Sequence, residues 1–476
     1  MDSKAFKYEQ VVKSIEDLIS SLELKPGDKI PSVRKLSETL NVSITTVFQA
    51  YNILEARGLI QSKPKSGYYV SNSIKKIEPF NIIEKGYIPL PVEVEINEMA
   101  TTMMRNSREN GVLNFSILSP VNEFLPITRL NKAVSNALRE MSSVNFQYPL
   151  VEGDPKILYQ LSLQTISWPT KLSKDQILVT NGAMEAINLC LDAIAEPGDV
   201  IAVESPTYHG ILQSLETRKL KVLEVPTNPF TGIILDELEK LLENNSVKAC
   251  VFMPRTSNPT GASMPEESKK ILADLLGSKN IPLIEDDTLG ELQFFNSHSL
   301  PVKAYDNYNN VLYCSSVSKT LAPGFRIGWV SGSKFHKKIE KLKFGANIST
   351  TGVFQNAIGK YFESGQYPSH IRKMSISVQC QVNKYIDAIQ KHFPSTIRIA
   401  EPAAGFSLWI ELPKEIDSIE LQREALANGI GLCPGYIFSM TGMYNNFIRI
   451  NCCPLWSFKV ENGIKKIGGL IKKMMS

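Results

Sequence analysis

The sequence predicts an α/β protein with two parts, a small helical domain that carries a β-hairpin and a large domain built on a mostly parallel sheet. The chain has 476 residues, which is about three times the roughly 150 residues expected for one domain. Residues 1–72 hold three helical patterns and a hairpin pattern. After residue 112, apolar β-branched runs alternate with helical stretches, an order typical of parallel sheets covered by helices on both faces.

The small domain, expected over residues 1–72, begins with apolar residues at helical spacing between residues 8 and 24, and this pattern ends at Pro26 and Gly27. PSVRKLSETL and SITTVFQAYNILEARG predict two further helices, with Ser32 and Ser43 as their N-caps. LIQSKPKSGYYV predicts a hairpin with a basic tip. Three helices followed by a hairpin form a winged helix-turn-helix.

Residues 73–111 show little periodicity and are expected to be a linker, so the large domain is expected over residues 112–476. Its sheet is predicted from the runs QILVT, DVIAVE, KVLEVP, KACVFM, IPLIED and NVLYCSS. GFSLWIEL and FIRIN, mixed with long helices near the end of the chain, predict a smaller α+β lobe.

Composition excludes several classes of protein. No apolar run approaches the ~18 to 20 residues of a membrane helix, and the polar, acidic start MDSKAFKYEQ does not resemble a signal peptide. Seven cysteines without a C-x-x-C pair argue against a disulfide framework and a zinc knuckle, so a cytoplasmic protein without a metal is expected. The adjacent Cys452 and Cys453 are interpreted as buried strand residues, with a redox sensor as the alternative.

Charge is uneven along the chain. Residues 1–76 hold 12 Lys and Arg against 8 Asp and Glu, whereas the remainder holds 40 of each sign. The whole net charge of +4 therefore lies in the N-terminal 76 residues. A local positive field favours a phosphate-backbone partner, although an excess of this size is common in other domains as well.

The run PGDKIPSVRKLSETLNVSITTVFQAYNILEARGLIQSKPKSGYYV resembles the GntR family of bacterial regulators, which implies double-stranded DNA as a partner. The resemblance implies contacts to phosphates or base edges from Arg34, Ser43, Thr45 and Thr46, and a position along the minor groove or backbone for Lys63, Lys65 and Gly67. Taken singly, Arg34 or Lys65 is more often a solvated surface residue. The prediction of DNA contacts depends on the whole series of residues occurring in the order typical of the family. Ile44 and Phe48 depart from the family, which often has basic residues there.

The strongest motif in the large domain is SSVSKTLAPGFRIGW at residues 315–329. A covalent bond between an amine and a phosphorylated aldehyde requires an unprotonated lysine, hydroxyl donors and a fixed positive charge for the phosphate. Lys319, Ser316, Ser318 and Arg326 supply these groups. The motif resembles the cofactor-lysine signature of fold-type I aminotransferases, and the resemblance spans residues from about Asn114 to the C-terminus. It implies pyridoxal 5'-phosphate as the cofactor.

Further motifs follow in the order of that family. TNGAMEA resembles the turn whose amides hold the phosphate at a helix N-terminus, which implies this role for Gly182, Ala183 and Met184. The resemblance also implies that Tyr208, in ESPTY, stacks on the pyridine ring and that Asn258, in SNPTG, donates to the phenolic oxygen. Taken singly, a tyrosine such as Tyr208 is more often a core-packing residue, and N-P-x-G is simply a turn.

Three polar residues complete the implied site. Asp286, in IEDD, is assigned to the pyridine nitrogen, with Asp287 as the alternative one residue away. Arg449, in FIRI, is expected to bind a substrate or effector carboxylate in bidentate fashion. Tyr148 resembles the tyrosine that reaches the phosphate of a neighbouring subunit, which implies a homodimer.

Leu289 is a departure with consequences for mechanism. Three residues after the pyridine-binding Asp, aminotransferases usually have a Tyr that donates to the phenolic oxygen, and this chain has Leu289. Without that donor, proton transfer should suffer more than covalent attachment of the cofactor.

The two resemblances together are similar to the MocR group of GntR regulators, in which the large domain is a sensor. We therefore expect a regulator in which Lys319 binds pyridoxal phosphate and Arg449 holds an amino-compound effector. One alternative is a working aminotransferase with an accessory DNA-binding domain. Another is a regulator that responds to pyridoxal phosphate alone and controls vitamin B6 supply.

Overall fold

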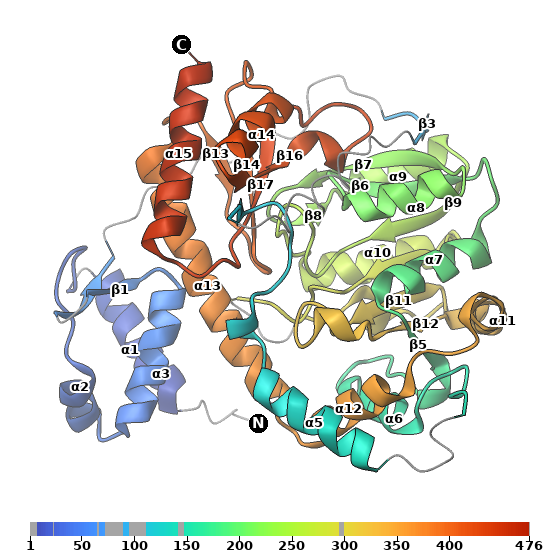
Figure 1. The fold of residues 1–476 in the computed structure, drawn as a ribbon, viewed down its shortest axis with the longest axis horizontal. Helices are drawn as coiled ribbons and strands as arrows, with labels where there is room; N and C mark the ends of the chain where they lie inside the picture. Colours follow the sequence, from blue (N-terminus) through green and yellow to red (C-terminus); the bar gives the residue numbers. More distant parts are fainter. Residues whose placement is uncertain are drawn as a thin grey trace.

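The computed structural model describes residues 7–21, 23–63, 66–71, 89–94, 111–140, 147–294 and 299–475. Figure 1 shows a small N-terminal head beside a large sheet-containing body. Within these residues no helix is long and apolar enough to span a membrane.

The head, defined here as the described part of residues 7–71, is the predicted winged helix. Its elements are α1 (Lys7–Ser20), α2 (Val33–Leu40), α3 (Ile44–Ala56), β1 (Ile60–Lys63) and β2 (Gly67–Val70). Both predicted N-caps are confirmed, because Ser32 Oγ accepts from Lys35 N (3.3 Å) and Ser43 Oγ accepts from Thr46 N (3.1 Å). Val47, Tyr51 and Leu54 of α3 are fully buried and fix that helix to the head's core.

The large domain is built on a nine-stranded sheet with the order β3-β7-β6-β9-β10-β11-β12-β5, in which β8 pairs with β7. Strands β7, β6, β9, β10 and β11 run parallel, whereas β3, β8 and β12 are antiparallel to their neighbours and β5 is antiparallel to β12. The bounds are β3 Val92–Glu93, β5 Ile177–Thr180, β6 Val200–Ser205, β7 Lys221–Asn228, β8 Gly232–Ile233, β9 Val247–Phe252, β10 Leu283–Asp286, β11 Val311–Ser316 and β12 Gly328–Ser331. All six predicted strand runs are therefore confirmed.

Helices cover both faces of this sheet (Figure 1). Side chains alternate along β6, so Ile201 and Val203 pack on the face with α7 and α8, whereas Ala202 packs on the face with α9 and α10. These helices and the others around the sheet are α5 Ile127–Arg139, α6 Pro155–Gln164, α7 Ala183–Ile194, α8 His209–Thr217, α9 Leu235–Asn244, α10 Glu266–Ser278, α11 His336–Asn347 and α12 Gly352–Glu363. Short 3-10 helices lie at η1 Asn122–Phe124, η3 Lys174–Gln176, η4 Val302–Tyr305, η5 Pro323–Phe325, η6 Ser333–Phe335 and η7 Gly435–Phe438.

The C-terminal part forms the predicted smaller α+β lobe. Its sheet has the order β13-β14-β17-β16, and β15 pairs with β4 from the start of the large domain. The bounds are β4 Leu113–Asn114, α13 Tyr367–His392, β13 Arg398–Ala400, β14 Ser407–Glu411, α14 Ser418–Ala427, β15 Ile430–Gly431, β16 Cys433–Pro434, β17 Phe447–Asn451 and α15 Phe458–Met474. Cys452 and Cys453 are buried in and beside this lobe's core, in keeping with the structural interpretation of the pair.

Most of the predicted linker, residues 73–111, lies outside the described residues. Its described residues 89–94 contribute β3 to the edge of the large sheet, where Val92 pairs with Val222 and Glu93 with Lys221. A Glu93–Lys221 ion pair (3.4 Å) adds to this contact. This segment therefore belongs structurally to the body.

Candidate cofactor site and nucleic-acid interface

The carboxyl ends of neighbouring parallel strands meet at one edge of the large sheet, where ligands of open α/β sheets bind. Strand β10 ends at Asp286 and β11 at Ser316, three residues before Lys319. Strands β6 and β9 end at Ser205 and Phe252, and the turns that follow them carry Tyr208 and Asn258. Residues from four separate motifs of the sequence are thus brought to one edge by parallel strand pairing.

Lys319 lies in a turn after β11 and its ammonium group is poorly solvated. Its Nζ donates to the carbonyl oxygen of Leu118 (2.5 Å). Burial, followed by the positive charge of Arg449, lowers the pKa of Lys319 to about 8. A substantial fraction of this amine is therefore neutral near physiological pH and able to act as a nucleophile.

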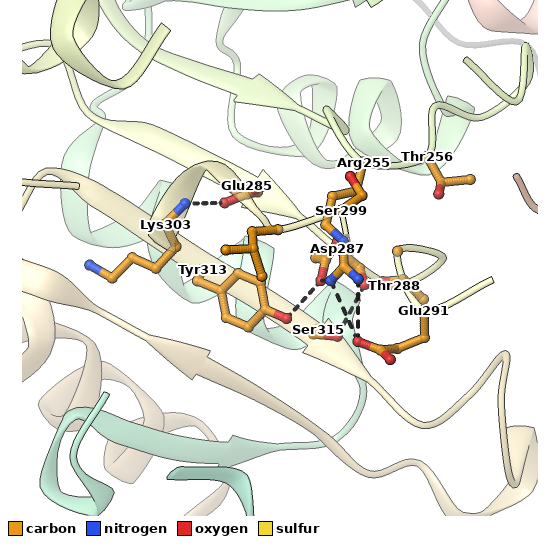
Figure 2. A network of polar contacts seen from close by, with 12 residues as sticks. Arg255, Thr256, Glu285, Asp287, Thr288, Glu291, Ser299, Lys303, Tyr313 and Ser315 are labelled. Atoms are coloured by element: carbon orange, nitrogen blue, oxygen red, sulfur yellow. Dashed lines mark hydrogen bonds and ion pairs between the residues drawn. The ribbon is translucent and has the colours of Figure 1, made fainter. Parts of the chain in front are cut away.

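The two adjacent aspartates are used differently, and Figure 2 shows the network around the second one. Asp287 pairs with Arg255 (Nη1 to Oδ2, 2.7 Å) and accepts from the Tyr313 hydroxyl (2.7 Å), while Arg255 also reaches Glu291. Asp286 instead accepts from the backbone N and hydroxyl of Thr288 (3.0 and 2.5 Å) and lies within the electrostatic influence of Lys319. The geometry favours Asp286 as the cofactor residue, because Asp287 already neutralises Arg255.

Arg326 lies at the start of α7, where anions are favoured. Helix α7 begins at Ala183 with Gly182 as its N-cap, which has φ +85° and makes no side-chain capping bond. The first amides of the helix, from Ala183 and Met184, are therefore available to a ligand. Arg326 donates to Ser318 Oγ (3.2 Å) and to the carbonyl of Asn181 (3.0 Å), and Ser316 Oγ accepts from Ser318 N (3.3 Å). All six predicted phosphate-binding residues thus lie in one cluster.

Arg449 is 2% exposed in β17 and its charge is not neutralised by a carboxylate within the described ranges. It donates from Nη1 to Asn258 Oδ1 (3.0 Å) and from Nη2 to the carbonyl of Ser116, and it lies over the Phe438 ring, 5.1 Å from its centroid. Its Nε has no partner among the described atoms. A buried cation with a spare donor is what a bound carboxylate would satisfy.

Tyr208 lies against Gly210, because a Cβ added there would be 2.5 Å from the tyrosine ring. Its ring also meets that of His209 edge-on, with centroids 4.6 Å apart. Sequence reasoning missed His209, for which only its position beside Tyr208 is a signal. Burial and the charges of Arg449 and Lys319 lower the pKa of His209 to about 3, so this ring is neutral.

Two predicted features fall outside this cluster. Tyr148 is 81% exposed and the single chain does not bring it to Lys319, so its role towards a neighbouring subunit stays a prediction. Leu289 is 6% exposed and packs with Phe115, Leu118 and Leu292 in the core of the smaller lobe. An aliphatic side chain therefore occupies the position where a phenol would be expected.

The predicted DNA-contacting residues whose side chains the structure describes lie on the surface of the head. The hydroxyls of Ser43, Thr45 and Thr46 gather at the N-terminus of α3, with Ser43 Oγ 2.7 Å from each threonine oxygen. Arg34 is exposed on α2, and Gly67 opens β2 with φ +107°. The Lys65 prediction lies outside the described residues, and for Lys63 the structure describes only the backbone of β1, opposite Gly67.

Comparison with known proteins matches both parts. Residues 111–467 match the family described as aminotransferase class I and II, and residues 7–70 match bacterial regulatory proteins of the gntR family. The chain is 34% identical over 469 residues to the uncharacterized HTH-type transcriptional regulator YdcR of Escherichia coli, covering 98% of this chain and 100% of that protein. It is 26% identical over 459 residues to the HTH-type transcriptional regulator NorG of Staphylococcus aureus, covering 94% of this chain and 100% of that protein.

Solved structures give the same result for the body. The crystal structure of multiple substrate aminotransferase from Thermococcus profundus superimposes with a TM-score of 0.74 at 25% identity, over 80% of this chain and 96% of that one. The similarity therefore extends over nearly the whole length of that aminotransferase.

A Gly182→Ala substitution tests the phosphate cluster. The added Cβ would lie 2.2 Å from Arg326 Nη2, on a backbone with positive φ, so it should displace the guanidinium. We expect pyridoxal phosphate to bind at least about tenfold more weakly, or about 1.4 kcal/mol, as measured by absorbance titration. Gly345→Ala is the matched control, because its Cβ would meet nothing within 4 Å. Equal affinity of both variants would contradict the assignment.

The low pKa of Lys319 predicts how its reactivity depends on pH. A lowered pKa means that the neutral, reactive amine forms at lower pH, so acetic anhydride should acetylate Lys319 half-maximally near pH 8. Mass spectrometry of the peptide that contains Lys319, in protein freed of bound ligands, measures this midpoint. A midpoint above pH 10 would show that the amine is not held in this environment.

Proposed function

The chain belongs to the MocR-type regulators of the GntR family, transcription regulators in which a winged helix-turn-helix is joined to an aminotransferase-like domain, and on this premise we propose that its large domain binds pyridoxal 5'-phosphate on Lys319 and thereby controls DNA binding. This proposal rests on the poorly solvated amine of Lys319, which donates to the Leu118 carbonyl and lies within the electrostatic influence of Arg449, Asp286 and Arg326.

The residues of the site fit pyridoxal phosphate on three counts. The buried Arg449 has a donor without a partner, a Cβ at Gly182 would close the space beside Arg326, and α7 has amides without a side-chain cap. When bound, pyridoxal phosphate supplies an aldehyde that bonds covalently to amines and a ring that withdraws electrons when its nitrogen is protonated.

Each residue then has one task towards that group. Lys319 offers its neutral amine, and Asp286 holds a proton on the ring nitrogen through a buried carboxylate. Arg326, Ser316, Ser318 and the amides of Ala183 and Met184 bind the phosphate. Tyr208 covers one face of the ring, and the side-chain NH2 group of Asn258 donates to the phenolic oxygen.

Arg449 supports sensing of a second ligand. We propose that its guanidinium binds the carboxylate of an amino-compound effector, since the cation is buried and its contacts are to neutral oxygens. The aliphatic Leu289 favours sensing over turnover, because it removes a donor that would assist proton transfer.

Transamination assays with a panel of amino acids separate this function from that of an active aminotransferase. A spectral change on adding amino acids separates it from sensing of the cofactor alone.

We further propose a cytoplasmic homodimer in which the exposed Tyr148 reaches the phosphate bound by the partner subunit. Each chain is divided into a head (1–72), a connecting segment (73–111) whose residues 89–94 join the sheet of the body, and the body itself (112–476). Double-stranded DNA is the partner of the head, with α3 entering the major groove.

Replacing the lysine tests the proposed function. In Lys319→Ala, pyridoxal phosphate should no longer change the affinity for operator DNA, because covalent retention is lost, and the wild-type chain should respond. Fluorescence anisotropy with and without the cofactor measures both. Lys270→Ala, which removes an exposed lysine from α10, is the control. A cofactor response that survives in Lys319→Ala would contradict the proposal.

Helix α3, the proposed recognition helix that enters the major groove, carries two exposed apolar side chains from which we predict base contacts. Ile44 and Phe48 are 53% and 50% exposed, one turn apart on α3, and apolar side chains in the major groove contact thymine methyl groups. Binding sites selected from random duplexes should therefore contain thymine at the contacted position. Ile44→Arg should shift this preference to guanine, at about 1–3 kcal/mol per base pair, and Ile127→Arg in the body should not. An unchanged consensus for Ile44→Arg would rule the contact out.

A further inference from the structure

Helix α13 contacts both the turn that carries Lys319 and helix α3 of the head. It runs from Tyr367 to His392 over 26 residues, a length of about 39 Å at 1.5 Å per residue. Figure 1 shows it (orange) passing between the head and the body, beside α3. Its first half contacts the lysine turn, and its second half contacts α3.

The first half of α13 is bonded to the turn that carries the lysine. His370 Nε2 lies 2.7 Å from the carbonyl oxygen of Thr320, and the Tyr367 hydroxyl lies 3.3 Å from Thr320 Oγ1. A carbonyl only accepts, so Nε2 must carry the hydrogen of this bond. Tyr367 and Ile371 also pack in one core cluster with Val317 and Leu321, which flank Lys319. The start of α13 is therefore fixed to the residues on both sides of the lysine.

The second half of α13 is bonded to the recognition helix. Asn383 Nδ2 donates to the carbonyl of Ala56 (2.7 Å) and approaches that of Glu55 (3.4 Å), at the C-terminus of α3. The last carbonyls of a helix have no partner within it, so a side-chain amide from the body completes the end of α3. Asn383 comes thirteen residues after His370, about 20 Å further along the helix.

The segment between these contacts is rigidly packed. Met374, Val378 and Val382 are buried in the core of the smaller lobe. Two residues beyond Asn383, the Tyr385 hydroxyl donates to the carbonyl of Pro454 (2.8 Å). A helix held in a close-packed core moves as a unit rather than bending. Because close-packed interiors transmit strain, a displacement of the lysine turn would be passed along α13 towards Asn383.

We propose that α13 couples the cofactor site to the DNA-binding head, with His370 as the positioning residue at the lysine turn and Asn383 as the positioning residue that caps and orients recognition helix α3. This inference rests on the proposed function for its biological use. The mechanical link itself involves only residues of this chain and can be measured without cofactor or DNA.

Hydrogen exchange in the full-length protein measures the link. Asn383→Asp keeps the size of the side chain but replaces the donor by a carboxylate that the two carbonyls repel. Amides of residues 50–59 should then exchange about fivefold faster, the effect of losing one such bond. Asn244→Asp is the matched control, because that asparagine is exposed and bonds to its own helix (2.8 Å to the Lys240 carbonyl). Unchanged exchange in Asn383→Asp would overturn the capping role.

The lysine end is tested in the same assay. His370→Phe removes the donor to Thr320 and should also raise exchange in residues 50–59, at least twofold, but not when Asn383→Asp is already present. Equal effects of His370→Phe in both backgrounds, or none in either, would overturn transmission through α13.

DNA binding distinguishes the two proposals. In the wild type, the ratio of DNA dissociation constants with and without pyridoxal phosphate should differ from one. In Asn383→Asp this ratio should fall towards one, while affinity for the cofactor stays within twofold. A wild-type ratio of one would reject the proposed function and leave the exchange experiments to decide on the link. A full ratio in Asn383→Asp would reject the link alone.

Discussion

The electrostatic environment of one buried amine is the constraint on which the account of this protein depends. Burial lowers the pKa of Lys319 most, the positive charges of Arg449 and Arg326 lower it further, and the negative charge of Asp286 acts against them. A charged lysine is costly in such a place unless it is paired. The arrangement lowers that cost by favouring the neutral amine, which is the form that bonds to an aldehyde. The parallel strands β10 and β11 place Asp286 and the Lys319 turn at one edge of the sheet.

Much of the fold could be predicted from short-range patterns in the sequence, and the candidate site residues from the order of their motifs along the chain. The six strand runs, the N-caps Ser32 and Ser43 and the smaller lobe follow from periodicity and capping chemistry, which act over a few residues. Each half of the phosphate cluster is similarly local, since Ser316, Ser318 and Arg326 lie within one motif and residues 182–184 within another. Local signals therefore sufficed wherever the interacting residues are close in the sequence.

Contacts between distant segments were not predictable in the same way. The sequence offers two adjacent aspartates, Asp286 and Asp287, and no local pattern distinguishes them. Only the fold shows that Arg255 and Tyr313 both contact Asp287. The bond between Arg449 and Asn258 joins residues 191 positions apart, and that between Asn383 and Ala56 joins residues 327 apart. His209 and Asn383 carry no motif, because their roles arise from the packing of helices whose relative placement no local pattern records.

Reductive trapping with borohydride tests directly whether Lys319 itself carries the cofactor. Purified full-length protein is incubated with pyridoxal phosphate, reduced with sodium borohydride, digested and mapped by mass spectrometry. We expect a single predominant modified peptide that contains Lys319, and we expect this modification to be lost on dialysis against an excess of a competing amine before reduction. Modification spread over surface lysines, with Lys319 unmodified, would contradict the account.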